Sequence, residues 1–204
     1  MLKKIIIILI ILALTGAVVA LVHNLKVAYK NKKELAAFKD NLSYRASLGK
    51  VLVIYYSWMG HTQAIANQIA ALTKADVYRI ETAEVFKSSP AFYTRVKKDL
   101  LNKNYPELKG SMPDLSSYDT IFVGGPVWWY TMATPLYSFL GQVDFKGKKV
   151  VPFSTQGSNS GSFLEDFKTN AKGANLGSYE KFNNVNKKYD TAVNNKIINW
   201  LNNL

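Results

Sequence analysis

Hydrophobic and polar positions alternate along the chain in segments that favour strands and helices in turn. An unbroken apolar run from Val51 to Tyr56 is typical of a strand buried on both faces. Apolar residues then recur at helical spacing from Ala64 to Leu72. The same reasoning predicts further strands over 76–80, 118–124, 149–153 and, with a weaker pattern, 176–182, and helices over 90–103, 135–140, 163–171 and 190–204.

This order of segments predicts an α/β fold. Strands that alternate regularly with helices form a parallel sheet, with right-handed crossovers and helices on both faces. The third strand is expected to break at Gly124-Gly125-Pro126, and Pro135 suits the first turn of the following helix. Ligands of such sheets bind beyond the carboxyl ends of the strands, so the loops at that edge carry the functional prediction.

A separate apolar segment precedes this domain. Lys3 and Lys4 are followed by eighteen mainly apolar residues, Ile5 to Val22, which as a helix would be about 27 Å long and just span a bilayer. A cleaved signal peptide and an uncleaved single-pass anchor both fit, and the anchor is favoured because the run is long and Ala17-Val18-Val19-Ala20 lacks the usual cleavage spacing. The basic start resembles an export signal and favours an extracytoplasmic domain, although the charges on the two flanks do not decide orientation.

The sequence therefore divides into residues 1–24 as an anchor or signal, 25–49 as a basic, partly helical spacer, and 50–204 as the folded domain. The charge is distributed unevenly over these segments. The chain has 26 basic and 14 acidic residues, and nine of the basic but only two of the acidic residues lie in the first 50 positions. A basic excess beside an apolar span favours anionic lipid over nucleic acid. The chain has no cysteine, which excludes disulfides, thiolate catalysis and Cys-ligated iron–sulfur clusters, so a redox role requires a bound cofactor.

The loop after the first strand is a candidate anion site. Ser57-Trp58-Met59-Gly60-His61-Thr62 joins a buried strand to a helix, whose first turn offers unpaired N–H groups and the positive end of the helix dipole. A phosphate can bind there without Lys or Arg. The alternative is that Ser57 and Thr62 only cap the helix.

Two more loops follow the third and fourth strands. Pro126-Val127-Trp128-Trp129-Tyr130-Thr131 places three aromatic residues together, at least one of which cannot face the core, so we expect a flat ligand, a partner surface or a lid over the sheet edge. The other loop, 154–161, is rich in hydroxyl and amide groups, and Gly157 would let its backbone approach a planar heterocycle. Alone, that segment would be interpreted as a surface loop.

Together the three loops resemble those of the flavodoxin family over residues 50–204. Ser57-x-x-Gly60-x-Thr62 resembles its phosphate loop, Val123-Gly124-Gly125-Pro126-Val127-Trp128-Trp129 its aromatic loop in long-sequence bacterial relatives, and Phe153-Ser154-Thr155-Gln156-Gly157 its third flavin loop. The resemblance implies a doubly wound five-stranded parallel sheet of order 2-1-3-4-5 that binds FMN.

The resemblance also implies roles for residues. The hydroxyls of Ser57 and Thr62 and the N–H groups of Trp58, Met59, Gly60, His61 and Thr62 would hold the FMN phosphate. Trp128 or Trp129, in the loop with Pro126, Val127 and Tyr130, would stack on the isoalloxazine. Thr155, Gln156, Gly157 and Ser158 would meet its pyrimidine edge. No metal site and no catalytic acid or base is implied.

The chain departs from the family pattern at three points. Met59 replaces a commonly polar phosphate-loop residue, Tyr130 stands where Gly often follows the aromatic pair, and the protein is basic where flavodoxins are typically acidic. The usual redox partners are therefore not assumed for this chain.

Three functions follow in order of preference. The first is a membrane-tethered FMN electron carrier acting between redox partner proteins or small acceptors. The second is an FMN-dependent NAD(P)H:quinone-type reductase, and the third, kept because of Met59, is a flavin-free scaffold. A hydrolase is disfavoured because His23 and His61 are the only histidines and no nucleophile elbow is present.

Overall fold

The domain is built on a parallel sheet whose strands run in one direction toward a common edge. The computed structural model describes residues 2–38, 41–183 and 191–204. The sheet order is β2-β1-β3-β5-β6, with β7 also paired to β5. Its strands are β1 (Val51–Tyr55), β2 (Asp76–Arg79), β3 (Thr120–Trp128), β4 (Thr131–Met132), β5 (Lys149–Gln156), β6 (Asn175–Leu176) and β7 (Glu180–Asn183).

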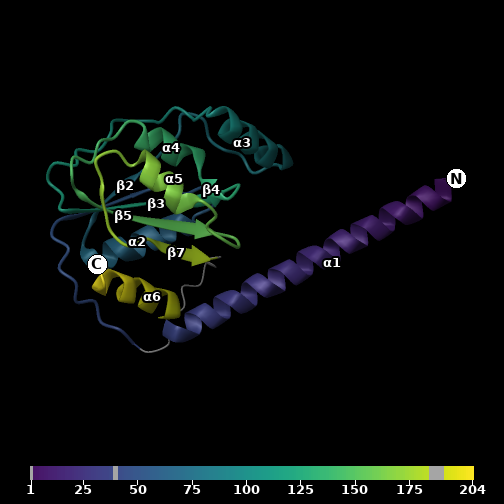
Figure 1. The fold of residues 1–204 in the computed structure, drawn as a ribbon, viewed down its shortest axis with the longest axis horizontal. Coiled ribbons are helices and arrows are strands. Elements are labelled where there is room, and N and C mark those ends of the chain that lie inside the picture. The colour runs from purple at the N-terminus through teal and green to yellow at the C-terminus, as the bar shows by residue number, and fades with distance from the viewer. Residues whose placement is uncertain (1, 39–40, 184–190) are drawn as a thin grey trace.

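Helices cover both faces of this sheet (Figure 1). Two of them, α2 (His61–Thr73) and α6 (Thr191–Asn202), pack on one face, where Ile65, Ile69, Ile197 and Leu201 meet Val53 and Phe122 in one apolar core. The other face carries α3 (Pro90–Asn102), α4 (Thr134–Leu140) and α5 (Phe163–Asn170), which bury a second core. The predicted doubly wound α/β fold is therefore confirmed.

The sheet differs from the prediction in detail. The short strand β4 pairs antiparallel with β3, and the predicted fifth strand over 176–182 is divided into β6 and β7. With β4 set aside and β6 and β7 taken as one interrupted strand, the order corresponds to the expected 2-1-3-4-5. Asp190, expected to begin the last helix, lies outside the described residues, and α6 begins at Thr191.

The expected break at Gly124-Gly125-Pro126 is wrong, because β3 continues through it to Trp128. The two glycines allow neighbouring side chains to pack closely against the strand. A Cβ at Gly124 would lie 2.2 Å from Cζ of Phe153, and one at Gly125 would lie 2.3 Å from Cδ1 of Leu136. Here glycine marks the close approach of a neighbouring side chain rather than the end of a strand.

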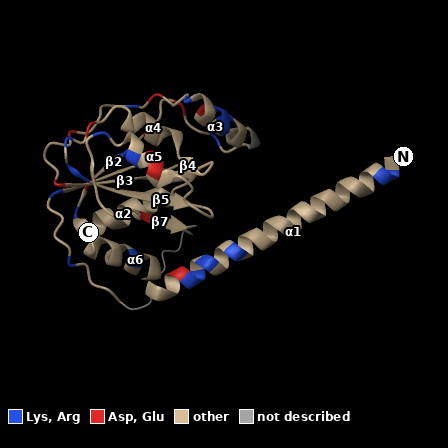
Figure 2. Ribbon diagram, in the orientation of Figure 1, with Lys and Arg blue, Asp and Glu red and all other residues tan. Residues whose placement is uncertain are grey.

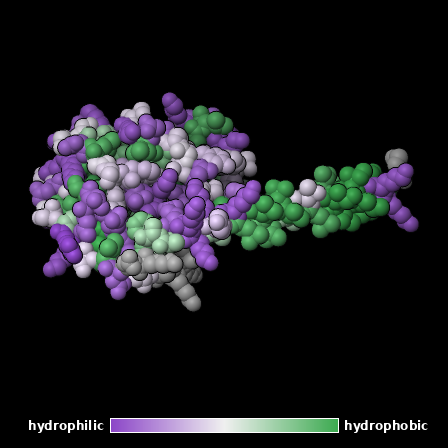
Figure 3. All heavy atoms as spheres, turned by 60° about the horizontal axis from the view of Figure 1, so that its bottom comes forward, coloured by the Kyte–Doolittle hydropathy of each residue, from purple (hydrophilic) through white to green (hydrophobic). Residues whose placement is uncertain are grey.

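The N-terminal segment is a single helix, α1 (Leu2–Leu35), followed by a short 3₁₀ helix η1 (Ala36–Phe38). It runs without interruption across the expected boundary at residue 24. Figure 2 shows Lys and Arg positions in blue near both ends of this helix and none between them, and Figure 3 shows an apolar surface along the middle of the helix. By length and composition α1 can cross a membrane, although a signal sequence meets the same criterion.

The segment after η1 is fastened along α6 by two asparagines. Asn195 donates to the Phe38 carbonyl at 3.0 Å and accepts from the Leu42 N–H at 3.3 Å. Seven residues, or about two helical turns, later, Asn202 donates to the Ser43 carbonyl at 2.9 Å and accepts from the Arg45 N–H at 2.8 Å. The part of the spacer from 41 to 48 is therefore extended along the domain rather than helical.

The packing of Gly124 gives the first prediction. Gly124→Ala is expected to lower the free energy of unfolding by about 1–3 kcal/mol, because the added methyl overlaps the Phe153 ring and overpacked cores lose stability of that order. Urea unfolding of the full chain in detergent measures the change. Gly16→Ala is the matched control, since a Cβ there meets no atom within 4 Å, and an equal loss in both variants would contradict this explanation.

Candidate flavin-binding site

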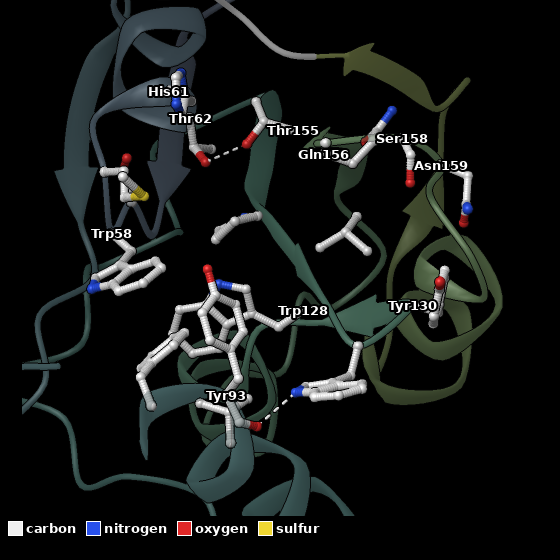
Figure 4. Close-up of a pocket in the computed structure, with 18 residues that line it drawn as sticks. Trp58, His61, Thr62, Tyr93, Trp128, Tyr130, Thr155, Gln156, Ser158 and Asn159 are labelled. Atoms are coloured by element: carbon white, nitrogen blue, oxygen red, sulfur yellow. Dashed lines mark hydrogen bonds between the residues drawn. The ribbon is translucent and has the colours of Figure 1, made fainter. Parts of the chain in front are cut away.

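A cavity of about 560 Å³ opens at the carboxyl edge of the sheet (Figure 4). That volume is in the range of small-molecule and cofactor sites. The segments that follow β1, β3 and β5 form it together with one side of α3. Its lining residues are Ser57, Trp58, Met59, His61, Thr62, Phe92, Tyr93, Val96, Pro126, Val127, Trp128, Trp129, Tyr130, Thr155, Gln156, Gly157, Ser158 and Asn159.

The first loop turns sharply into α2. Gly60 is the residue before the helix and has φ 89°, a left-handed conformation that glycine adopts without strain. No side chain among the described residues caps this end, so capping does not account for the hydroxyls here. Ser57 Oγ instead accepts the Gly60 N–H at 3.2 Å, which holds the loop in a tight turn.

Thr62 joins this loop to the third one. Its Oγ1 lies 2.8 Å from Oγ1 of Thr155, and both residues are buried. The two hydroxyls share one proton between them, so each retains hydrogen-bonding capacity toward the cavity. The pair therefore places two hydroxyl groups beside the positive end of α2.

An aromatic cluster forms the wall below these groups. Trp58 stacks on Phe92 at 4.0 Å between ring centroids, and its Nε1 donates to the Phe86 carbonyl at 2.9 Å. Trp128, only 7% exposed, meets Tyr56, Trp58 and Phe92 edge to face. Trp58 and Trp128 are thus fixed parts of the wall, and α3 is held over the cavity by the same cluster.

The next two aromatic residues form the rim. Trp129 and Tyr130 make the two-residue connection between β3 and β4, with φ 50° and 64°. Two consecutive left-handed residues are what a tight hairpin turn requires, and Asn or Gly usually occupies them. Trp129 is 43% and Tyr130 61% exposed, which confirms that the aromatic run cannot all face the core.

Contacts from three directions hold this strained turn. Trp129 Nε1 donates to the Tyr93 carbonyl at 2.8 Å, and Lys97 Nζ lies 5.0 Å from its ring centroid. The Tyr130 carbonyl accepts from the Ser162 N–H at 2.7 Å. A Cβ at Gly161 would lie 1.9 Å from that carbonyl oxygen, so only glycine permits this approach.

A carboxylate supports the turn from behind. Asp166 accepts hydrogen bonds from Thr131 Oγ1 and, at 2.6 Å, from Ser162 Oγ. Tyr137 OH lies 2.6 Å from the same threonine hydroxyl, and burial raises the pKa of Tyr137 to about 12. The phenol therefore stays protonated and can remain in this network at physiological pH.

The third loop begins inside the sheet, because β5 extends to Gln156. Gln156 Nε2 donates to Oδ1 of Asn183 at 2.8 Å, and its Oε1 accepts from Ser154 Oγ at 2.8 Å. Tyr179 OH also bonds Ser154 Oγ, and burial raises the pKa of this phenol. The amide of Gln156 is thus oriented by neighbours on both sides.

The cavity brings together fourteen of the fifteen residues expected to bind a cofactor, and only Gly60 is missing from its lining. Met59 lines the rim of the cavity, and 65% of its surface is exposed. Sequence reasoning missed Phe92, Tyr93 and Val96 on α3, and Asn159 in the third loop. The adjacent aromatic pair 92–93, in the first turn of the helix that follows the second strand, was the available signal, because the segment that leads to this helix starts at the same edge of the sheet.

A family model described as Flavodoxin matches residues 50–204. The chain belongs to the flavodoxin family. Among solved structures it is similar to a putative flavoprotein from Bacteroides uniformis, with 27% identity, TM-score 0.65, and coverage of 76% of this chain and 99% of that one. A flavoprotein from Lactobacillus acidophilus solved in complex with FMN is 26% identical, with TM-score 0.59 and coverage of 65% and 92%.

Curated relatives point to redox chemistry. A protein from Azorhizobium caulinodans named NAD(P)H dehydrogenase (quinone) is 30% identical over 95 residues, 47% of either chain, and one of the same name from Nitrobacter winogradskyi is 33% identical over 95 residues with the same coverage. This flavodoxin-family chain spans about half the length of the curated relatives it matches. The name NAD(P)H dehydrogenase (quinone) describes the activity of those relatives.

FMN is the cofactor of this flavodoxin-family domain. The cavity fits it on three observations: an uncapped helix start lies at one end, paired buried hydroxyls lie beside it, and aromatic surfaces line the remainder. Of the described residues that line the cavity, none is Lys, Arg, Asp or Glu. The phosphate site therefore relies on N–H and hydroxyl groups, as the loop sequence predicts.

The strained turn generates the second prediction. Tyr130→Gly is expected to raise the free energy of unfolding by a few tenths to about 1 kcal/mol, since a left-handed non-glycine residue costs roughly 1–2 kcal/mol and glycine returns part of that through the unfolded chain. The same change should weaken FMN binding by removing a rim aromatic. Urea unfolding and FMN titration measure the two effects.

Lys103→Gly is the matched control, because Lys103 has φ 53° at the end of α3 and does not line the cavity. It should gain similar stability with unchanged FMN affinity. A Tyr130→Gly variant that binds FMN as tightly as the original chain would show that Tyr130 does not contact the cofactor.

Proposed function

We propose that this protein is a membrane-tethered FMN-dependent electron-transfer protein. The observation that carries the proposal is the convergence of three strand-end loops on one cavity, with an uncapped helix start at its phosphate end and an aromatic rim at the other. FMN, when bound, supplies one- and two-electron redox chemistry. The protein holds and orients it.

The phosphate end would be held by the first loop. The first residues of α2, His61 and Thr62, line the same end of the cavity as Ser57. The unpaired N–H groups of a helix start and the helix dipole stabilise an anion without a cationic side chain. Because Gly60 N–H is already bonded to Ser57 Oγ, the serine can donate its own proton to the phosphate.

The ring system would lie between the rim and the third loop. Trp129 is the better stacking surface of the tryptophan pair, because Trp128 is enclosed by edge contacts from other rings. The Gln156 amide, oriented by Ser154 and Asn183, faces the polar edge of the heterocycle together with Thr155 and Ser158. An amide offers both a donor and an acceptor, which suits the pyrimidine edge of a flavin.

The membrane attachment would be made by α1. Its apolar part has the length of a bilayer core, and the basic residues near its domain end suit anionic lipid headgroups. Attachment as an uncleaved anchor and an extracytoplasmic domain both stay predictions from the sequence. The flavin-free scaffold, suggested by the missing hydroxyl at Met59, is disfavoured because FMN is the cofactor of the flavodoxin family to which the chain belongs.

The third prediction tests the cofactor site. The purified full chain in detergent is expected to show flavin absorbance near ~450 nm after FMN addition. Thr62→Val should raise the dissociation constant for FMN about 10- to 100-fold, the value of one hydrogen bond to a charged group. Fluorescence titration of FMN measures this change.

Thr73→Val is the control. It makes the same substitution at the other end of α2, where the hydroxyl only donates to the Ile69 carbonyl. Equal affinities in the two variants would remove Thr62 from the phosphate site, and a chain that binds no FMN at all would overturn the proposed function.

Quinone reduction with a nicotinamide donor is the second candidate function. The observations that favour it are the name shared by the curated relatives and the exposed rim, which leaves an approach for a flat acceptor. This activity needs access to one face of the isoalloxazine.

The fourth prediction separates the carrier from the reductase. If the protein is a reductase, the FMN-loaded chain oxidises NADH or NADPH with menadione as acceptor, followed by nicotinamide absorbance. An electron carrier accepts electrons from dithionite but shows no nicotinamide oxidation above free FMN. The free cofactor at equal concentration is the control.

A further inference from the structure

The last turn of α1 contacts the domain immediately beside the cofactor cavity. Asn31 Nδ2 donates to the Asn183 carbonyl at 3.0 Å, and Asn183 Nδ2 donates to Glu34 Oε2 at 3.3 Å. The other side-chain atom of Asn183 accepts from Gln156, which lines the cavity. The apolar helix is therefore two hydrogen bonds away from the flavin site.

A buried lysine strengthens this joint. Lys196 on α6 is only 4% exposed, and its Nζ lies 2.5 Å from Glu34 Oε1, 3.1 Å from Glu180 Oε1 and 2.5 Å from the Lys181 carbonyl oxygen. Its ammonium also lies 4.9 Å from the centroid of the Phe182 ring. Removing one partner from such a buried charge is costly, so Glu34 is held in place by the domain.

The described residues on either side of positions 39–40 also bind the domain. The Phe38 carbonyl and the Ser43 carbonyl are bound by Asn195 and Asn202 along the length of α6. A flexible linker would lack such contacts with the domain. The connection between α1 and the domain is consequently a docked joint, and the direction of α1 relative to the sheet is a property of the fold.

That direction places the cavity and the apolar span on the same side of the domain. Strands β5 and β7 point toward the side to which α1 extends (Figure 1). From Glu34 back to Val22, where the apolar run ends, is twelve residues, or about 18 Å of helix. The mouth of the cavity therefore lies on the membrane side whenever α1 spans a bilayer.

The chemistry of the mouth suits an apolar interface. Its exposed residues Met59, Tyr93, Trp129 and Tyr130 present thioether and aromatic surface. Tyrosine and tryptophan are enriched at the level of lipid headgroups. Lys26, Lys30, Lys32 and Lys33 on the adjoining part of α1 add positive charge for anionic lipid.

We propose that the docked joint of α1 turns the flavin cavity toward the bilayer surface, where the electron acceptor is a quinone dissolved in the membrane. This inference rests on the proposed function. The quinone takes up two electrons and two protons at its two carbonyl oxygens and becomes the hydroquinone. Both electrons and both protons come from reduced FMN, which returns to the oxidised form and is reduced again by a nicotinamide or a redox protein.

The fifth prediction measures orientation without any redox reaction. Because the chain has no cysteine, Met59→Cys at the cavity mouth and Ser117→Cys near the amino ends of the strands each give a single dye site. The full chain is placed in nanodiscs of phosphatidylethanolamine and phosphatidylglycerol that contain headgroup-labelled acceptor lipid. Energy transfer should be stronger from position 59 than from position 117.

The joint is tested in the same discs. Asn31→Ala/Glu34→Ala removes its contacts with Asn183 and Lys196 and keeps good helix formers, so the difference between the two dye positions should shrink. Lys32→Ala, an exposed residue of the same turn, should preserve the difference. Equal transfer from both positions in the original chain, or a difference that survives the double substitution, would overturn the proposal.

The acceptor is tested with FMN-loaded protein reduced by dithionite without oxygen. Reoxidation by a long-chain isoprenoid quinone in the same disc should slow at least tenfold in the double variant, while reoxidation by a charged, water-soluble naphthoquinone sulfonate should keep its rate. Equal slowing for both quinones, or no effect on either, would overturn the membrane route. Failure of FMN to bind is detected beforehand by absorbance and counts against the proposed function alone.

Discussion

The parallel pairing of β1, β3 and β5 is the constraint on which the site depends. Its register aligns Tyr55, the last residue of β1, with Gly124 and Gly124 with Phe153, and beyond this level β3 and β5 continue side by side to Trp128 and Gln156. The Phe153 ring occupies the space that a side chain at 124 would need. Because the strands are this close and run toward the same edge, the phosphate loop, the aromatic turn and the third loop meet around one cavity, and Thr62 can bond Thr155 there.

Most of the fold and of the site follows from the sequence for simple reasons. Strands buried on both faces are continuous apolar runs, and helices show apolar residues at helical spacing. The type and order of the elements can therefore be predicted from the hydrophobic pattern. A parallel sheet has only one edge at which its strands end, which brings together loops that are distant in sequence. That is why fourteen of the fifteen expected residues, from Ser57 to Ser158, line the cavity.

What the sequence did not reveal depends on tertiary contacts. Glycine at 124 and 125 has the same local signature in a loop and in a tightly packed strand, and only the neighbouring rings and side chains decide between them. Phe92 and Val96 have the spacing of ordinary core residues, so their place over the cavity required knowing where α3 lies. Asn195 and Asn202 look like exposed helix positions until the spacer is seen to bind them.

The joint of α1 offers a reason for the way charge is distributed in this basic protein. A soluble carrier finds its partners by diffusion and gains from long-range electrostatic attraction. A carrier fixed beside a membrane meets a membrane-dissolved partner at high effective concentration and needs no such steering. In that arrangement charge serves attachment: the basic excess per residue is concentrated in the first 50 residues, whereas the lining of the cavity, among the described residues, carries no Lys, Arg, Asp or Glu. If the rim faces the bilayer as proposed, specificity would rest on which apolar molecule the bilayer delivers to it, and the ion pair of Glu34 with Lys196 would help to set that orientation.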